Sequence, residues 1–306
     1  STFKPMTVAA CLDEGVTTGS RAYHCDGYQV INGVRIKCVA YSRGGHGTIN
    51  ICQSLMESCN DVLMQLGADL GKRKFLQYVN EFGFGKKTGI DLPGEATGGV
   101  FTNDTMHAVE LATSSFGQGQ TVTMIQMAAA FSSVINGGNY YEPHVVKEVK
   151  SENGAVLESN DNALVRRVIT ENTSKKLRKY LYKTVEEGTA LPAKVAGYQI
   201  GGKTGTAEKH PTGRGNYLVS FIGFATKDNP EVMIYVTIDE PHVADQAHST
   251  YATQFSSEVL KEVLPVLGMY QDSSTKKADN TKSSGCGSNT RAISSCGNIF
   301  VFSSNT

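Results

Sequence analysis

The sequence predicts an α+β fold in which a mainly helical half precedes a half built on an antiparallel sheet. Between residues 1 and 136 the apolar side chains recur mostly at helical spacing, whereas residues 197–240 contain three apolar, β-rich runs joined by short loops. A chain of 306 residues with 40% hydrophobic content can bury a full core. Its 29 basic residues balance 29 acidic ones, so no overall field favours nucleic acid or an anionic membrane as a partner.

The first half is expected to open with a helix over residues 1–14, with Ser1 as its N-cap. The dipeptide Asn32-Gly33 stands between two β-branched runs and predicts a small hairpin within residues 20–40. Helical spacing then continues in four segments, over residues 48–56, 60–70, 72–82 and 121–136.

The second half is expected to begin with a hairpin over residues 145–158 and a long amphipathic helix over residues 170–187. A meander of three antiparallel strands follows, over residues 197–209, 216–226 and 231–240. A helix over residues 252–267 is expected to cover one face of that sheet. Residues 271–306 are rich in Ser, Asn, Lys and Thr, which predicts a disordered tail after a domain spanning residues 1–270.

Three short motifs that carry chemistry occur in the order Ser1-Thr2-Phe3-Lys4, Ser58-Cys59-Asn60 and Lys203-Thr204-Gly205-Thr206. On a helix, residues i and i+3 are neighbours, so we expect the Lys4 amine to lie against the Ser1 hydroxyl as a nucleophile and base pair. A lysine at its reference pKa of about 10.4 keeps its proton, so burial or a nearby cation such as Lys203 must lower the pKa of Lys4. The backbone N–H of Ser1 is expected to supply half of an oxyanion hole.

The third motif lies in a predicted strand, where Lys203 and Gly205 face one way and the two threonines face the other. Gly205 permits a substrate backbone to approach the strand closely. Each motif alone is a weak signal, because a serine N-cap followed by a lysine is common on surface helices. Their joint occurrence in one order favours an acyl-serine enzyme.

Together the three motifs resemble the penicillin-recognising acyl-serine transferases. Three longer segments are similar to class B penicillin-binding proteins rather than to β-lactamases: TGIDLPGE (88–95), SSFGQGQTVTMIQMAAAFSSVINGG (114–138) and SFIGFATKDNPEVMIYVTIDEP (220–241). The similarity is continuous from Ser1 to about Tyr270. It implies the transpeptidase fold shared with serine β-lactamases, a helical subdomain plus an antiparallel sheet covered by helices. The family carries a membrane anchor, a pedestal domain and the opening strands of the sheet before its nucleophile, so we expect an N-terminally truncated domain that lacks those strands.

The resemblance implies a peptidoglycan D,D-transpeptidase that cross-links stem peptides through an acyl-serine intermediate and binds penicillin covalently. In this family pattern Ser1 is the nucleophile, Lys4 is its base, and Ser58 relays a proton to the leaving amine. Asn60 bonds both Lys4 and the substrate amide, and Lys203 supplies positive potential. The side chain of the intervening cysteine is expected to point away.

On the substrate side, the resemblance implies that the Thr204 and Thr206 hydroxyls bind the terminal carboxylate of the stem peptide. The N–H of Thr206 completes the oxyanion hole, and Gly205 leaves room for the substrate backbone.

The partners implied are a stem peptide ending in D-Ala-D-Ala, β-lactams and a membrane glycan polymerase, but no nucleic acid. The implied location is extracytoplasmic, with a membrane anchor in the full-length protein, and the cellular role is division, elongation or sporulation. One alternative is an enzyme of the same fold that transfers the acyl group to water: a β-lactamase, a β-lactam sensor or a D,D-carboxypeptidase. A second is a non-catalytic cell-wall scaffold, against which the intact motif residues count.

A second constellation comprises Asp13, His24, Cys25 and Cys38, whose ligand types suit tetrahedral zinc. The chain resembles class B proteins of anaerobic Gram-positive bacteria that carry such a site near the catalytic centre. Two alternatives are a disulfide between Cys25 and Cys38 and free buried thiols, and Cys11 is an alternative ligand to Asp13. Catalysis is expected to need no cofactor, and a bound zinc would be structural.

The remaining histidines show no mutual metal spacing. His46 lies between two glycines and is expected to be a turn residue rather than a base. Cys286 and Cys296 lie in the predicted tail, where they either pair or stay free.

Overall fold

The computed structural model describes residues 1–160, 164–209, 211–271 and 297–303. The chain divides into two compact units: unit 1 comprises Ser1–Thr2, Leu55–Ser58 and Arg178–Thr306, and unit 2 comprises Phe3–Ser54 and Cys59–Leu177. Both units combine helices with antiparallel strands, which confirms the predicted α+β class. No helix among the described residues has both the length and the apolar run that a membrane span requires.

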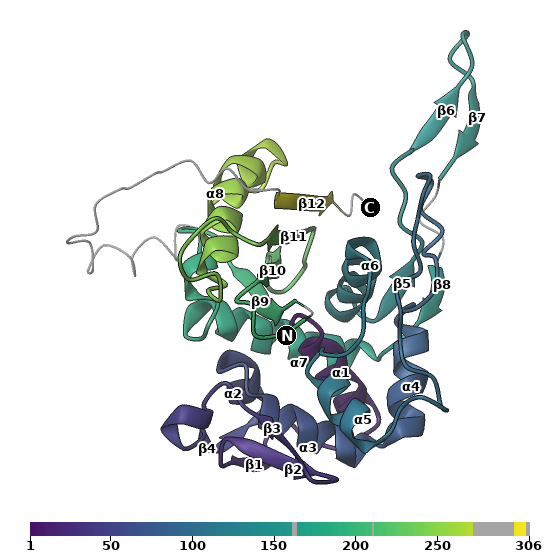
Figure 1. Ribbon diagram of the computed structural model, residues 1–306. Helices are drawn as coiled ribbons and strands as arrows, with labels where there is room; N and C mark the ends of the chain where they lie inside the picture. Colours follow the sequence, from purple (N-terminus) through teal and green to yellow (C-terminus); the bar gives the residue numbers. More distant parts are fainter. Residues whose placement is uncertain (161–163, 210, 272–296, 304–306) are drawn as a thin grey trace, which may run out of the picture. The chain divides into compact units, whose positions relative to one another are not determined.

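Unit 1 is built on a four-stranded antiparallel sheet with the strand order β12-β11-β10-β9 (Figure 1). Its strands are β9 (Ile200–Glu208), β10 (Tyr217–Ala225), β11 (Val232–Asp239) and β12 (Gly297–Ser303). The strands β9, β10 and β11 confirm the predicted meander. One face of the sheet packs against helix α8 (Thr250–Val266), as the sequence predicted. The core between them is apolar, with the buried residues Val219, Phe221, Ile234, Val236, Leu260 and Leu264.

Strand β12 lies within the segment that the sequence predicted to be a disordered tail. Its backbone pairs with β11 from Ser303 opposite Val232 to Gly297 opposite Ile238. The residues Ile299–Phe302 are β-branched or aromatic, which favours a strand, but the polar residues around them dominate the composition of the tail. The two tail cysteines, Cys286 and Cys296, lie outside the described residues.

Unit 2 is mainly helical. Its helices are α1 (Lys4–Asp13), α3 (Asn60–Leu70), α4 (Lys72–Glu81), α5 (Ala108–Ser115) and α6 (Met124–Ile135). Two further helices, α2 (Ile51–Met56) and α7 (Glu171–Glu186), each cross from one unit to the other along the chain. Helix α7 confirms the long helix predicted there, whereas the short helix α5 was not predicted.

Helix α1 begins at Lys4, so the prediction that Ser1 is its N-cap is wrong. The N-cap is Phe3, which makes no side-chain capping bond, and Pro5 lies in the first turn. A proline is tolerated there because its missing N–H would have no partner within the helix. A helix capped by Ser1 would move Pro5 to the position that donates the first intrahelical hydrogen bond. Every residue from Lys4 to Leu12 is buried.

Within its described residues, unit 2 also contains four two-stranded antiparallel sheets. They pair β1 (Ala22–Cys25) with β4 (Gly47–Asn50), β2 (Tyr28–Ile31) with β3 (Val34–Lys37), β5 (Asn139–Tyr141) with β8 (Leu164–Arg167), and β6 (Glu148–Lys150) with β7 (Val156–Ser159). The hairpin β2–β3 is the predicted one, and Asn32 and Gly33 in its turn have φ values of 49° and 80°, as a type I′ turn requires. Residues 48–50 belong to β4 and not to the predicted helix, because the β-branched Thr48 and Ile49 pair with β1.

Candidate functional site

Ser58-Cys59-Asn60 forms the turn between α2 and α3. The N–H of Ser58 donates to the Leu55 carbonyl at 3.2 Å and the N–H of Cys59 to the Ser54 carbonyl at 2.8 Å, which ends α2. Ser58 has a φ of 52°, a left-handed conformation that costs about 1–2 kcal/mol for a residue with a side chain. Glycine is the usual residue at such a helix end, so a serine here indicates that its hydroxyl has a use.

In unit 1, Lys203 of β9 is fully buried beside that hydroxyl. Its Nζ donates to Ser58 Oγ at 2.9 Å, to the Thr204 carbonyl at 3.2 Å and to Thr204 Oγ1 at 3.3 Å. Three acceptor oxygens match the three protons of an ammonium group. Unit 1 therefore brings the first residue of the second motif to the first residue of the third.

Gly205 has no room for a side chain. It is paired with Ser220 of β10, and a Cβ at Gly205 would collide with Ser220 Oγ and approach Thr2 Cγ2 to 3.1 Å. Of the two threonines expected to bind a substrate carboxylate, Thr204 is 5% exposed and Thr206 is exposed. Thr206 is thus the more accessible of the pair.

In unit 2, Lys4 is also fully buried, at the first turn of α1. Its Nζ donates to Asn60 Oδ1 at 2.7 Å. Burial lowers the pKa of Lys4 to about 7, against the opposing negative charge of Cys59 and Cys38. An amine with this pKa exchanges its proton near neutral pH, which suits a general base.

Asn60 is held by the last residue of β3 and by the residue that follows it. Its Nδ2 donates to the Lys37 carbonyl at 3.3 Å, and its backbone N–H donates to Cys38 Sγ at 3.3 Å. Ser1 belongs to unit 1 and Lys4 to unit 2, and each unit is described by itself. The expected contact between the Ser1 hydroxyl and the Lys4 amine therefore stays a prediction.

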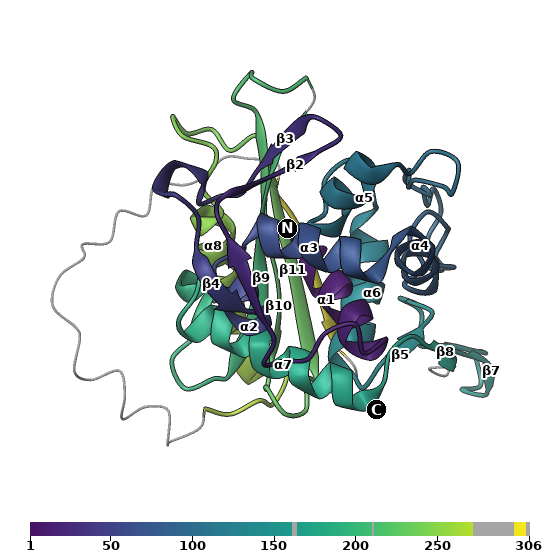
Figure 2. The same ribbon diagram turned by 90° about the horizontal axis from the view of Figure 1, so that it is seen from below.

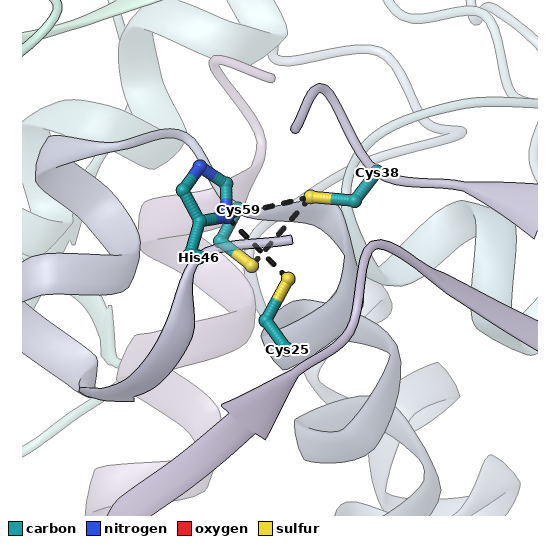
Figure 3. A group of neighbouring side chains, drawn as sticks. All are labelled: Cys25, Cys38, His46 and Cys59. Atoms are coloured by element: carbon teal, nitrogen blue, oxygen red, sulfur yellow. Dashed lines mark hydrogen bonds between the residues drawn. The ribbon is translucent and has the colours of Figure 1, made fainter. Parts of the chain in front are cut away.

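Four side chains of unit 2 converge on one point: Cys25, Cys38, His46 and Cys59 (Figure 3). They come from the end of β1, the residue after β3, the loop before β4 and the N-cap of α3. Their ligand atoms all lie within 4.8 Å of one another.

The distances within this cysteine–histidine cluster match a tetrahedral metal. Cys25 Sγ lies 3.4 Å and Cys38 Sγ 3.7 Å from His46 Nδ1, and the Sγ atoms of Cys38 and Cys59 are 3.7 Å apart. Around zinc, with Zn–S near 2.3 Å and Zn–N near 2.0–2.1 Å, a tetrahedron has S–S edges of about 3.8 Å and S–N edges of about 3.6 Å. Three cysteines and one histidine are also a common structural zinc set, so the donors fit the ion.

The thiols of the cluster are not equivalent. The hydrogen bond from the Cys59 thiol lowers the pKa of Cys38 to about 4, against the opposing effect of burial. The same bond and burial raise the pKa of Cys59, and burial raises the pKa of Cys25. A metal that binds here must displace protons from the thiols, so its affinity depends on pH.

Of the predicted metal ligands, the structure brings Cys25 and Cys38 together but not Asp13 and His24. Asp13 ends α1 and accepts hydrogen bonds from the N–H and the hydroxyl of Thr170, each at 2.8 Å. His24 precedes Cys25 in β1, and adjacent residues of a strand point to opposite faces. Its ring is consequently exposed, 3.3 Å from a hydroxyl of β4.

Sequence reasoning missed His46 and Cys59. His46 lies in the loop before β4 and not in a turn, and Gly45, at a φ of 97°, brings that loop against Cys25, where any Cβ at Gly45 would strike the Cys25 backbone. Cys59 was expected to point away, whereas its Sγ accepts the N–H of Val62 as the cap of α3. The signal available in the sequence was the position of Cys59 at the start of a predicted helix, where a capping side chain turns inward.

The alternatives for the cysteines are also resolved within the described residues. Cys25 and Cys38 are free thiols, so the disulfide alternative is not formed in this structure. Cys11 is buried elsewhere and donates to the Leu66 carbonyl at 3.4 Å.

Comparison with known proteins gives matches over most of the chain. A family model described as the penicillin binding protein transpeptidase domain matches residues 1–263. Stage V sporulation protein D of Bacillus subtilis is 41% identical over 274 residues, which are 88% of this chain and 42% of that protein. The probable peptidoglycan D,D-transpeptidase PenA of Neisseria flavescens is 28% identical over 285 residues, which are 92% of this chain and 66% of that protein. The chain thus spans less than half of the first relative and about two thirds of the second.

Solved structures match as well. The crystal structure of penicillin-binding protein 3 from Mycobacterium tuberculosis, complexed with aztreonam, has a TM-score of 0.80 at 25% identity and covers 90% of this chain and 64% of its own. That of the D,D-transpeptidase domain of a peptidoglycan glycosyltransferase from Eggerthella lenta has a TM-score of 0.77 at 25% identity, covering 88% of this chain and 65% of its own. These matches confirm the fold that the motifs implied.

Proposed function

The chain belongs to the penicillin-binding protein transpeptidase family, and we propose that it acts as a peptidoglycan D,D-transpeptidase that also binds penicillin covalently. One observation carries this proposal: each end of Ser58-Cys59-Asn60 is hydrogen-bonded to a buried lysine. Ser58 Oγ accepts from Lys203 at 2.9 Å, and Asn60 Oδ1 accepts from Lys4 at 2.7 Å. Two buried lysines on one short motif have no evident structural advantage, because burying a charge is costly unless it is paired.

In the proposed reaction Ser1 Oγ attacks the carbonyl of the penultimate D-alanine and passes its proton to the Lys4 amine. The bond to the terminal D-alanine then breaks, and Ser58 relays a proton to the leaving amine. A neighbouring stem amine next attacks the acyl-serine, which forms the cross-link and restores Ser1. A pKa of about 7 supports Lys4 as the base, since a large fraction is neutral near neutral pH.

On the substrate side, Lys203 acts as a fixed cation near the terminal carboxylate, which the Thr204 and Thr206 hydroxyls bind. The backbone N–H groups of Ser1 and Thr206 stabilise the oxyanion. A β-lactam reacts through the same first step and leaves slowly, because the proposed machinery activates no deacylating water.

We propose that the cysteine–histidine cluster, Cys25, Cys38, His46 and Cys59, holds a structural zinc ion. Its support is the donor set and the near-tetrahedral spacing of the ligand atoms. Bound zinc supplies four bonds that tie strand ends to the start of α3, and no step of the reaction uses it. Because Cys38 accepts the N–H of Asn60, the cluster also orients that amide.

The cellular setting is proposed from the relatives. We place the full-length protein outside the cytoplasm, anchored in the cell membrane beside a glycan polymerase. The 41% identity to a stage V sporulation protein supports sporulation among the three possible roles.

The test is intact-mass spectrometry before and after incubation with benzylpenicillin, beside a Ser1→Ala variant. A stable adduct of one penicillin that is absent in the variant is the expected result. Folded protein with no adduct and with the penicillin intact would remove the acyl-serine mechanism and leave a scaffold. Hydrolysed penicillin with no adduct would instead identify a β-lactamase.

A further inference from the structure

The hairpin β2–β3 packs against α3 through strand β2 (Figure 2). On the α3 side, Gln29 Nε2 donates to the buried carboxylate of Asp61 at 2.6 Å. Tyr28 is paired with Lys37 and Val30 with Arg35, and paired residues of an antiparallel ladder lie on the same face. Because side chains alternate along a strand, these four lie opposite Gln29 and face outward.

Two tyrosines and two cations form a continuous row on this outer face. Arg35 lies over the Tyr28 ring at 5.0 Å from its centroid, and Lys37 lies over the Tyr41 ring at 4.5 Å. The two rings meet edge to face with centroids 5.9 Å apart. We name Arg35, Tyr28, Tyr41 and Lys37 the tyrosine–cation row.

The two cations of the tyrosine–cation row have no carboxylate partner among the described residues. Within the described part of the chain, no carboxylate lies within ion-pair distance of Arg35 or Lys37. Both cations are exposed, and Tyr41 is 36% and the neighbouring Val30 56% exposed. An exposed row of aromatic rings and cations in which the cations have no carboxylate partner favours a ligand that carries both apolar faces and negative charge.

The row is joined directly to the second motif. The carbonyl of Lys37 accepts from Asn60 Nδ2 at 3.3 Å, while the ammonium of the same residue lies over Tyr41. The next residue, Cys38, accepts the Asn60 N–H. A ligand on the row therefore contacts Lys37, whose backbone is hydrogen-bonded to the asparagine that bonds Lys4.

We propose that the tyrosine–cation row is a binding surface for an uncross-linked peptidoglycan strand, a glycan that carries stem peptides with free carboxylates. The inference rests on the proposed function and deepens it, because it assigns a site for the parts of the substrate beyond the reacting D-alanines. The C–H face of a sugar ring packs on the tyrosines, since flat aromatic rings offer large apolar contact with a polar edge. Carboxylates of the stem peptide pair with Arg35 and Lys37.

The experiment measures the affinity of purified, soluble, uncross-linked strands for the protein with Ser1→Ala, so that no acyl transfer disturbs the equilibrium. Two hairpin variants are compared: Arg35→Gln with Lys37→Gln, and Tyr28→Leu with Tyr41→Leu. The matched control is Lys147→Gln with Lys150→Gln, which removes two exposed cations from another part of unit 2. Polyglutamate serves as an unrelated polyanion, and thermal melting verifies that each variant is folded.

We expect each hairpin variant to weaken strand binding by about fivefold to tenfold, the size expected for two exposed contacts, and the control to change it less than about twofold. Raised salt should weaken binding to the parent protein more than to the Arg35→Gln, Lys37→Gln variant. Equal affinities in the hairpin variants and the control would overturn the proposal. So would polyglutamate binding as tightly as the strand with no effect of the tyrosine substitutions, which would reveal charge attraction alone.

The outcome is separable from that of the proposed function. A penicillin adduct on Ser1 together with hairpin-independent strand binding overturns only this inference. No penicillin adduct together with hairpin-dependent strand binding overturns only the transpeptidase assignment and leaves a glycan-binding surface.

Discussion

The two buried lysines of the candidate site are held in different ways. Around Lys203 in unit 1 the structure places three acceptor oxygens, from Ser58 and Thr204. Lys4 in unit 2 donates to the neutral amide of Asn60, and burial lowers its pKa to about 7. Burial lowers the pKa of Lys4, which suits an amine that takes up a proton, whereas the proposed role of Lys203 rests on its hydrogen bonds to oxygen acceptors.

Arginine substitutions test whether the two lysines have different roles, and they should have the largest effect on the acylation rate. Lys4→Arg should lower the rate constant for acylation by benzylpenicillin by about 10³-fold, because a guanidinium cannot lose its proton and serve as a base. Lys203→Arg keeps the positive charge and should cost only about tenfold. The rates are followed by intact mass, with thermal melting to check folding. Losses of the same size at both positions would show that the two lysines share one role.

Substitutions of Ser58 distinguish the contribution of its hydroxyl to the acylation rate from the effect of its backbone conformation on stability. Ser58→Gly and Ser58→Ala both remove the acceptor that Lys203 uses, so both should lower the acylation rate by about 10²-fold. Only glycine relieves the left-handed φ of 52°, so Ser58→Gly should be the more stable of the two by about 1 kcal/mol. Urea unfolding measures the difference. A glycine variant less stable than the alanine variant would contradict the strain argument.

The pH dependence of acylation sharpens the assignment of Lys4. The reactive form is the neutral amine, whose fraction rises as pH passes upward through a pKa of about 7. The rate constant should therefore increase about tenfold between about pH 6 and about pH 8. The measurement is the second-order rate with benzylpenicillin over that range. A flat profile would exclude Lys4 as the titrating base.

Metal removal should have the smallest effect on the rate, because the cysteine–histidine cluster supplies no reacting group to the proposed mechanism. We expect about one zinc per chain by elemental analysis, and its loss in Cys59→Ser but not in the Cys52→Ser control, which lies outside the cluster. Chelation should slow acylation by less than about tenfold. It should also lower stability by about 2.7 kcal/mol if free zinc stood at a hundredfold excess over its Kd. Purified protein without zinc would refute the proposed metal site.

The sequence was most informative where structure is decided locally. The turn at Asn32-Gly33 requires positive φ at both residues, and helical or alternating periodicity fixed α3, α4 and the strands β9, β10 and β11 to within a few residues. The motif residues were found from their order along the chain. The structure brings Ser58 to Lys203 and Lys4 to Asn60, while the chemical roles expected of these residues stay predictions.

The sequence was least informative where distant segments meet. Strand β4 forms because β1 pairs with it, and β12 because β11 offers an edge, and neither partner is near in sequence. His46 joins the cluster only because a glycine lets its loop touch Cys25. One error was avoidable: adjacent residues of a strand face opposite ways, so the predicted pair His24-Cys25 could not both bind one metal from within β1.

The crowding at Gly205 limits how this site can change under antibiotic selection. Any side chain there would push against Ser220 and against Thr2, the residue next to Ser1. A mutation that added bulk at Gly205 would thereby press on the residue next to Ser1, the proposed nucleophile. Under the proposed function, substitutions that reduce drug binding are therefore expected at the exposed Thr206 rather than at Gly205.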